Sequence, residues 1–187
     1  MGQFGELNNL WTSLAIWLVT VVLVVAAVID GLKLKVPNWL TFPFIVSGWI
    51  FSLASMGFEG LGWSMLGTVV GLALLLPAYA IGGMGAGDVK LLMGVGAWVH
   101  PTLTFYGFCV SAVVGAILAI GMVLYRRKWN KHYGQFFGIL TEMMVIKDPN
   151  QLAAIAAERK SSMMLLPYGI PIAIGTIAYF AWCGLLV

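Results

Sequence analysis

A glycine-rich run, Gly82-Gly83-Met84-Gly85-Ala86-Gly87-Asp88-Val89-Lys90, lies between two apolar blocks near the middle of the chain. Four glycines in six positions leave the backbone with few side chains and wide conformational freedom. A carboxylate and a lysine follow directly, in a chain whose apolar segments otherwise contain almost no charge. An open backbone beside an acid is useful mainly where another chain must come close, so we organise the reading of the sequence around this run.

The composition indicates the class of protein. Hydrophobic residues make up 61% of the chain and charged residues 9%, and the mean hydropathy is +0.97. A soluble domain carries about 25% charged residues. The sequence therefore predicts an all-α polytopic membrane protein that forms one domain over residues 1–187 and contacts lipid. The net charge of +3 is no signal for nucleic acid, and we expect no nucleic-acid partner.

Apolar runs predict about six transmembrane helices, because a helix crosses a bilayer with about 20 apolar residues. The fourth run is short, and its rise of about 18 Å falls below a full crossing. Breaks are predicted at Gly57-Phe58-Glu59-Gly60 and at His100-Pro101. The predicted segments are 10–29, 39–56, 61–81, 88–99, 103–125 and 165–187.

The charges predict the orientation of these segments. If the N-terminus faces outward, all ten Lys and Arg residues fall on one side, and Glu6 and Glu59 fall on the other. Basic residues near span ends collect on the cytoplasmic side. We therefore expect both termini outside and a location in the inner (plasma) membrane. The long polar connector 126–164 is then cytoplasmic, either as a segment that rests on the membrane surface or as a docking or gating element for a substrate.

Two acids touch the long apolar segments, Asp30 at the end of the first and Asp88 after the glycines. Each has an ordinary explanation, because Asp30 could extend toward the interface and Asp88 could cap a helix. However, a carboxylate at a helix C-terminus lies in an unfavourable dipole field that something must compensate. An ionisable residue near the bilayer is also a functional hypothesis by default.

Together, the two acids suggest hydrolysis. Two carboxyl groups at close range share one proton and so provide one base and one acid. The base activates a water that attacks a peptide carbonyl, and the acid protonates the carbonyl oxygen and then the leaving amine. We expect Gly85 and Gly87 to let an extended substrate strand lie beside Asp88, and we expect both acids at the cytoplasmic face.

The remaining chemistry-bearing residues support no other site. Pro37 marks a helix boundary, with Asn38 as the expected N-cap, and Lys90 either donates to the site or contacts lipid phosphate. His100 and His132 are isolated and predicted on opposite sides, which argues against a His-based triad or a zinc site. Cys109 and Cys183 are interpreted as small core residues. We therefore expect no metal and no cofactor.

These residues resemble a known family. Gly85-Ala86-Gly87-Asp88 matches the GxGD signature of intramembrane-type aspartyl proteases, and the run through Val89, Lys90, Leu91 and Leu92 looks like the type IV prepilin peptidase version. Asp30 followed by Val36-Pro37-Asn38 is similar to that family's first-aspartate region. Leu166-Pro167-Tyr168-Gly169 resembles a motif that opens its last span. The presenilin and signal-peptide-peptidase branch fits less well, since Ile29 rather than tyrosine precedes Asp30 and the last span has no Pro-Ala-Leu.

The resemblance implies an aspartic endopeptidase with Asp30 and Asp88 as its catalytic pair. Its partner would be a type IV prepilin or pseudopilin precursor, whose short basic leader is cut on the cytoplasmic side, after a glycine and just before the hydrophobic segment. Larger members carry paired cysteines and methylate the new N-terminus. This chain lacks those cysteines and looks like the small form found with tight-adherence (Flp-type) pili, so we expect a peptidase only. Archaeal preflagellin peptidases are a close relative.

Two other classes of function stay open at this point. A small ion- or proton-coupled transporter or channel component would use intramembrane acids near the bilayer midplane. A purely structural assembly subunit would tolerate Asp88→Asn. The sequence leaves open the identity of the precursor and the oligomeric state, whereas it predicts that both acids lie at one membrane face.

Overall fold

The structure is a computed structural model that describes residues 10–80, 83–125 and 167–186. Four helices make up its described elements: α1 (Leu10–Lys33), α2 (Asn38–Ala80), α3 (Ala86–Tyr125) and α6 (Gly169–Trp182). No strand occurs among the described residues, which confirms the all-α prediction for that part of the chain. The predicted connector 126–164 lies outside it.

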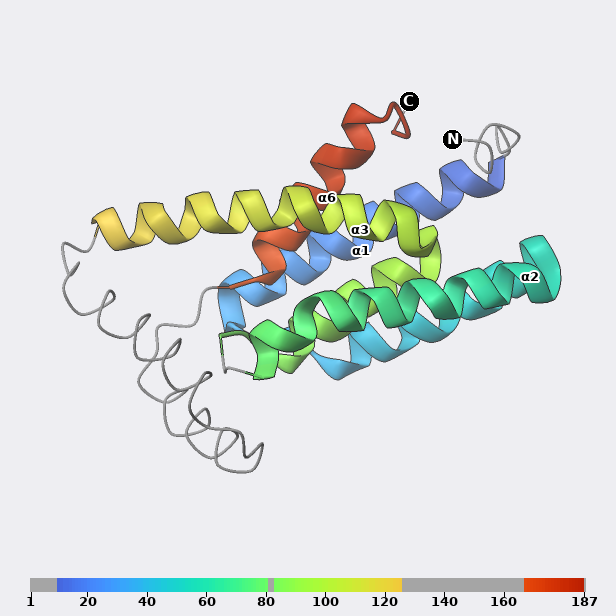
Figure 1. Cartoon of the computed structure of the whole chain (residues 1–187), viewed down its shortest axis with the longest axis horizontal. Coiled ribbons are helices and arrows are strands. Elements are labelled where there is room, and N and C mark those ends of the chain that lie inside the picture. The colour runs from blue at the N-terminus through green and yellow to red at the C-terminus, as the bar shows by residue number, and fades with distance from the viewer. Residues whose placement is uncertain (1–9, 81–82, 126–166, 187) are drawn as a thin grey trace.

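Two of these elements, α2 and α3, each consist of two helical arms joined by a sharp reversal. At 43 and 40 residues, α2 and α3 would measure about 65 and 60 Å if straight, about twice the apolar thickness of a bilayer. Instead, the backbone leaves helical geometry at Gly57 (φ 66°, ψ −154°) and at His100 (φ 64°, ψ 177°), and Figure 1 shows each helix turning back there. A hydrogen bond of 3.0 Å from Trp49 Nε1 to Thr68 Oγ1 joins the two arms of α2. Both breaks fall where the sequence predicted them.

Within the described residues, length and composition make three helical stretches suitable for crossing a membrane: Thr12–Lys33, Asn38–Ala80 and Ala86–Met122. Their outward faces are apolar, as lipid requires. On α1, for example, Trp17 is 52% exposed and Val21 58%. Cys109 and Cys183 are exposed as well, so the prediction that they are core residues was wrong. A helix in lipid is apolar on both faces, so an apolar sequence does not indicate burial.

The first arm of α3 is the centre of the fold. Leu91, Leu92 and Val95 are completely buried in it. Glycines let this arm approach both arms of α2 very closely, as small residues do between membrane helices. A side chain at Gly71 would meet the Leu92 carbonyl oxygen at 2.5 Å, and one at Gly96 would clash with the Gly67 carbonyl. Backbone contact therefore fixes the position of α3.

One end of the bundle gathers the segments that the sequence analysis singled out. Figure 1 shows the end of α1, the beginning of α3 and the beginning of α6 together, whereas the reversals within α2 and α3 lie at the opposite end. Lys33 ends α1 and Lys35 follows it, whereas Glu59 lies next to the reversal at Gly57. The described basic residues and the described glutamate therefore occupy opposite ends.

Replacing Gly96 by alanine tests the backbone contact between α2 and α3. We expect Gly96→Ala to lower the free energy of unfolding by about 1–3 kcal/mol, because the new methyl group overpacks against Gly67. Gly121→Ala on the same helix is the matched control, since nothing lies within 4 Å of its Cβ position. That control should be neutral or stabilising by about 0.5–1 kcal/mol. Thermal unfolding in detergent measures both, and equal effects would contradict the packing described here.

Candidate active site

Asp30 is buried where two helix ends meet. It lies in the last turn of α1 and is only 3% exposed. Its Oδ2 accepts a hydrogen bond of 2.8 Å from the backbone N–H of Gly169, the first residue of α6. The C-terminal end of α1 disfavours a negative charge there, whereas the N-terminal end of α6 favours one. The compensation that the sequence analysis required is therefore provided by α6.

Position 169 has room for glycine alone. A Cβ there would lie 2.9 Å from Asp30 Oδ2 and 3.0 Å from Asp30 Cβ, closer than non-bonded atoms approach. The absence of a side chain brings the α6 backbone near enough to donate its N–H. The glycine therefore determines the position of the Asp30 carboxyl group.

Asp88 is held by the glycine loop that precedes it. It is the third residue of α3 and is 5% exposed. Its Oδ2 accepts a hydrogen bond of 3.1 Å from the N–H of Gly85, and its own N–H donates to the Gly85 carbonyl at 3.2 Å. The bond from the Gly85 N–H to the Asp88 side chain is one half of a capping box, so the helix-capping role considered from the sequence is confirmed. A carboxyl group that served only as a cap would not need such burial.

Tyr168 links the surroundings of the two acids. It is half-buried directly before α6, and its neighbour Gly169 binds Asp30. Tyr168 lines the same pocket as Met84, and Met84 directly precedes Gly85, whose N–H binds Asp88. Tyr168 therefore stands one residue from the amide that binds Asp30 and shares a pocket with the residue before the amide that binds Asp88.

The connection between α1 and α2 packs against the glycine loop. A Cβ at Gly87 would lie 2.5 Å from the carbonyl oxygen of Val36. Glycine at this position thus serves contact within the chain. Pro37 follows Val36, and its carbonyl accepts the N–H groups of Leu40 and Thr41 at 3.1 and 3.3 Å. The hydrogen bonds of Pro37 begin α2, and the contact of Gly87 with Val36 holds the segment after Asp30 against the segment that contains Asp88.

Asn38 does not have the role predicted for it. The structure places it inside α2 as the first helical residue, so the N-cap prediction was wrong by one position. Its side-chain Oδ1 instead accepts a hydrogen bond of 2.9 Å from Lys90 Nζ. The same ammonium group lies 4.5 Å from the centre of the Phe42 ring. Lys90 therefore ties the start of α3 to the start of α2.

The structure thus places all seven predicted site residues at one end of the bundle, and it adds Tyr168 and Gly169. The sequence analysis quoted this pair only within a motif. Its position directly before the last apolar segment, at the predicted face of both acids, was the available signal. Among the described residues, no group of three His, Cys, Asp or Glu side chains is placed to hold a metal ion.

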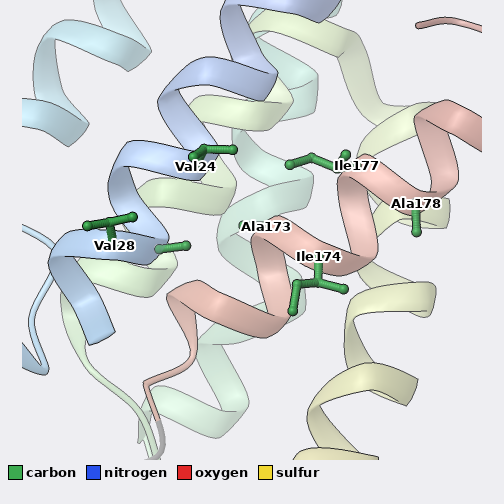
Figure 2. Close-up of a pocket in the computed structure, with 7 residues that line it drawn as sticks. Val24, Val28, Ala173, Ile174, Ile177 and Ala178 are labelled. Carbon is green, nitrogen blue, oxygen red and sulfur yellow. The ribbon is translucent and has the colours of Figure 1, made fainter. Parts of the chain in front are cut away.

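A separate apolar groove runs between α1 and α6 (Figure 2). Its volume is about 520 Å³, and only aliphatic side chains line it: Val24, Ala27, Val28, Ala173, Ile174, Ile177 and Ala178. It contains no group that could activate water or hold a charge. This groove therefore offers no acid–base group of its own.

Comparison with known proteins identifies similar sequences. A family model described as "Type IV leader peptidase family" matches residues 17–120, which include Asp30 and Asp88. The chain is 37% identical over 123 residues to the prepilin leader peptidase/N-methyltransferase of Aeromonas hydrophila, covering 62% of this chain and 42% of that protein. It is 36% identical over 123 residues to the protein of the same name from Neisseria gonorrhoeae, and this match covers 60% of this chain and 41% of that protein.

The matched region is thus less than half of these relatives' own length. No solved structure shows significant similarity to the chain.

Replacing Gly169 by alanine tests how Asp30 is held. We expect Gly169→Ala to lower the free energy of unfolding by about 1–3 kcal/mol, because the methyl group collides with the Asp30 carboxyl group. Gly31→Ala is the matched control beside the same acid, since its Cβ would meet Ile170 Cδ1 at an ordinary 3.5 Å. It should change the free energy of unfolding by less than about 0.5 kcal/mol. Unfolding in detergent measures the difference, and no difference would contradict the described contact.

Proposed function

The chain belongs to the type IV leader peptidase family, and on this premise we propose that it is a membrane aspartyl endopeptidase. Its substrate is a type IV pilin-like precursor, from which it removes the short basic leader. The observation that carries this proposal is the pairing of each buried acid with a backbone N–H at a helix N-terminus: Asp30 with Gly169 and Asp88 with Gly85. Both acids fall within the residues that match the family.

The two carboxyl groups divide the chemistry between them. Close carboxyl groups do not both ionise, so one carries the shared proton and the other acts as base. The base removes a proton from water as the water oxygen attacks the carbonyl carbon of the scissile peptide. The acid protonates the carbonyl oxygen and, as the tetrahedral intermediate collapses, a proton passes to the leaving amine. The N–H groups of Gly169 and Gly85 orient the two carboxyl groups throughout.

Burial of this pair at the end of the bundle suits a substrate that leaves the membrane there. We propose six crossings, with the two arms of α2 and of α3 counted separately and both termini outside. Support comes from Lys33, Lys35 and Lys90 near the acids and from Glu59 at the opposite end. Basic residues collect on the cytoplasmic side, so cleavage takes place at the cytoplasmic face of the inner membrane.

The assignment is limited to hydrolysis. The relatives' names combine a leader peptidase with an N-methyltransferase. A pair of acids can hydrolyse a peptide, whereas methyl transfer calls for different chemistry. We therefore propose a peptidase whose product has an unmethylated N-terminus, as in the small form that resembles the tight-adherence system.

A small ion- or proton-coupled transporter is the alternative. Such proteins use acids near the bilayer midplane and unwound helices around them. Here Asp30 lies in the last turn of α1 and Asp88 in the first turn of α3. That placement at helix ends favours a site reached from the membrane surface, and so it favours the peptidase.

Cleavage by single amide variants tests the proposed chemistry. The purified chain is incubated with a prepilin, and leader removal is followed by mass spectrometry, which also detects a methylated product. We expect Asp30→Asn and Asp88→Asn each to reduce cleavage by at least about 10³-fold, since an amide cannot exchange the proton. Glu59→Gln, the same change at an exposed acid of the opposite end, should retain wild-type activity. Cleavage that survives either aspartate replacement would falsify the assignment.

Metal removal provides an independent test of the same mechanism. The two acids and a water complete the reaction without a metal ion. Treatment with EDTA followed by removal of the chelator should therefore leave the cleavage rate within about twofold of the untreated protein, well short of the several kcal/mol that a catalytic metal supplies. Loss of activity that returns on adding Zn²⁺ or Mn²⁺ would contradict the acid-pair mechanism.

A further inference from the structure

A second, smaller pocket is lined in part by Met84 and Tyr168, the residues that directly precede the two glycines bound to the acids. Its volume is about 220 Å³, and it lies between the end of α2, the second arm of α3 and the start of α6. Pockets for drug-sized ligands measure about 300–1,000 Å³. This pocket is therefore suited to a single large side chain.

The walls of this pocket continue into the segments that hold the acids. Met84 lines the pocket and directly precedes Gly85, whose N–H binds Asp88. Tyr168 lines it as well and directly precedes Gly169, whose N–H binds Asp30. The pocket therefore shares a wall with each of the two segments that hold the acids.

The inner surface of the pocket is apolar. One wall is a face of α3 with almost no side-chain volume, formed by Ala112, Gly115 and Ala116. Ser111 also lines it, but its hydroxyl is engaged with the carbonyls of Gly107 and Ile172 at 2.7 and 3.2 Å. A polar or charged side chain would lose its hydration there without equivalent partners.

We propose that this pocket is the subsite for the first apolar side chain after the scissile bond. This inference rests on the proposed function, in which cleavage takes place just before the hydrophobic segment of the precursor. Burying a large apolar side chain in the pocket supplies binding energy and places the preceding peptide bond beside the acids. The pocket thereby selects precursors with a large apolar residue at this position.

Gly115 offers a direct way to fill the pocket. A Cβ at this position would lie 3.5 Å from Pro171 Cβ and 3.9 Å from Tyr168 Cε1. Alanine therefore fits at ordinary contact distances and narrows the pocket, whereas leucine occupies it. Val113→Leu is the control, because Val113 is 60% exposed on the outward face of the same helix.

The experiment compares two precursors that carry Phe or Ala immediately after the scissile bond. We expect Gly115→Leu to lower kcat/KM for the Phe precursor by at least about tenfold, while the Ala precursor stays within about twofold of wild type. Gly115→Ala should lower the ratio of kcat/KM for the Phe precursor to kcat/KM for the Ala precursor as well, but by a smaller factor. This variant keeps the test valid if the leucine variant does not fold. Val113→Leu should leave the ratio unchanged.

Each other outcome overturns the proposal. If Gly115→Ala and Gly115→Leu reduce cleavage of both precursors equally, the pocket serves structure and not selection. If neither variant changes the ratio, the side chain after the scissile bond binds elsewhere. If the wild-type chain cleaves neither precursor, the proposed function itself fails, and this result is distinct from the first two because it does not involve the variants.

Discussion

A carboxyl group buried at the C-terminal end of a helix is the constraint on which the rest of this structure depends. The partial negative charge of that helix end opposes the charge of Asp30, and little water reaches the group to offset it. The N-terminus of α6 provides the opposite field, and the Gly169 N–H provides the hydrogen bond. The last helix must therefore begin beside the end of the first, although 139 positions separate the two residues.

The second acid is also bound by a backbone N–H at the start of a helix, but its partner lies only three residues away in the sequence. Asp88 lies in the first turn of its own helix and accepts the Gly85 N–H. Close backbone contacts then bring the two arrangements to one end of the bundle. Gly87 packs on Val36, and Gly71 packs on Leu92, so the loop after Asp30 and the helix that begins near Asp88 have little freedom to separate. Glycine thus contributes mainly by allowing helices and loops to touch.

Much of this arrangement could be predicted from the sequence, because the bilayer restricts what an apolar chain can do. Apolar run lengths located α1, α2 and α3, and Gly57 and His100-Pro101 located both reversals. The last run, 165–187, was predicted as a full span, whereas α6 covers only Gly169–Trp182 of it. The rarity of charge identified Asp30 and Asp88. The partner of Asp30 was not predictable in this way, since a backbone N–H has no sequence signal of its own. The exposure of Cys109 was missed because the inward and outward faces of a membrane helix have the same composition. The position of Asn38 was predicted one residue too early in the helix because a helix start is uncertain by about a residue.

The central claim is that Asp30 and Asp88 face one another across a single site, and cross-linking tests it most directly. Cys109 and Cys183 are exposed and are first replaced by serine. Asp30→Cys and Asp88→Cys are then combined, and the chain is treated in membranes with a short bifunctional thiol reagent. The account predicts efficient linkage within one chain, and none when Asp30→Cys is paired with Glu59→Cys at the opposite end of the bundle. Absence of linkage between positions 30 and 88, with both thiols shown to be reactive, would contradict it.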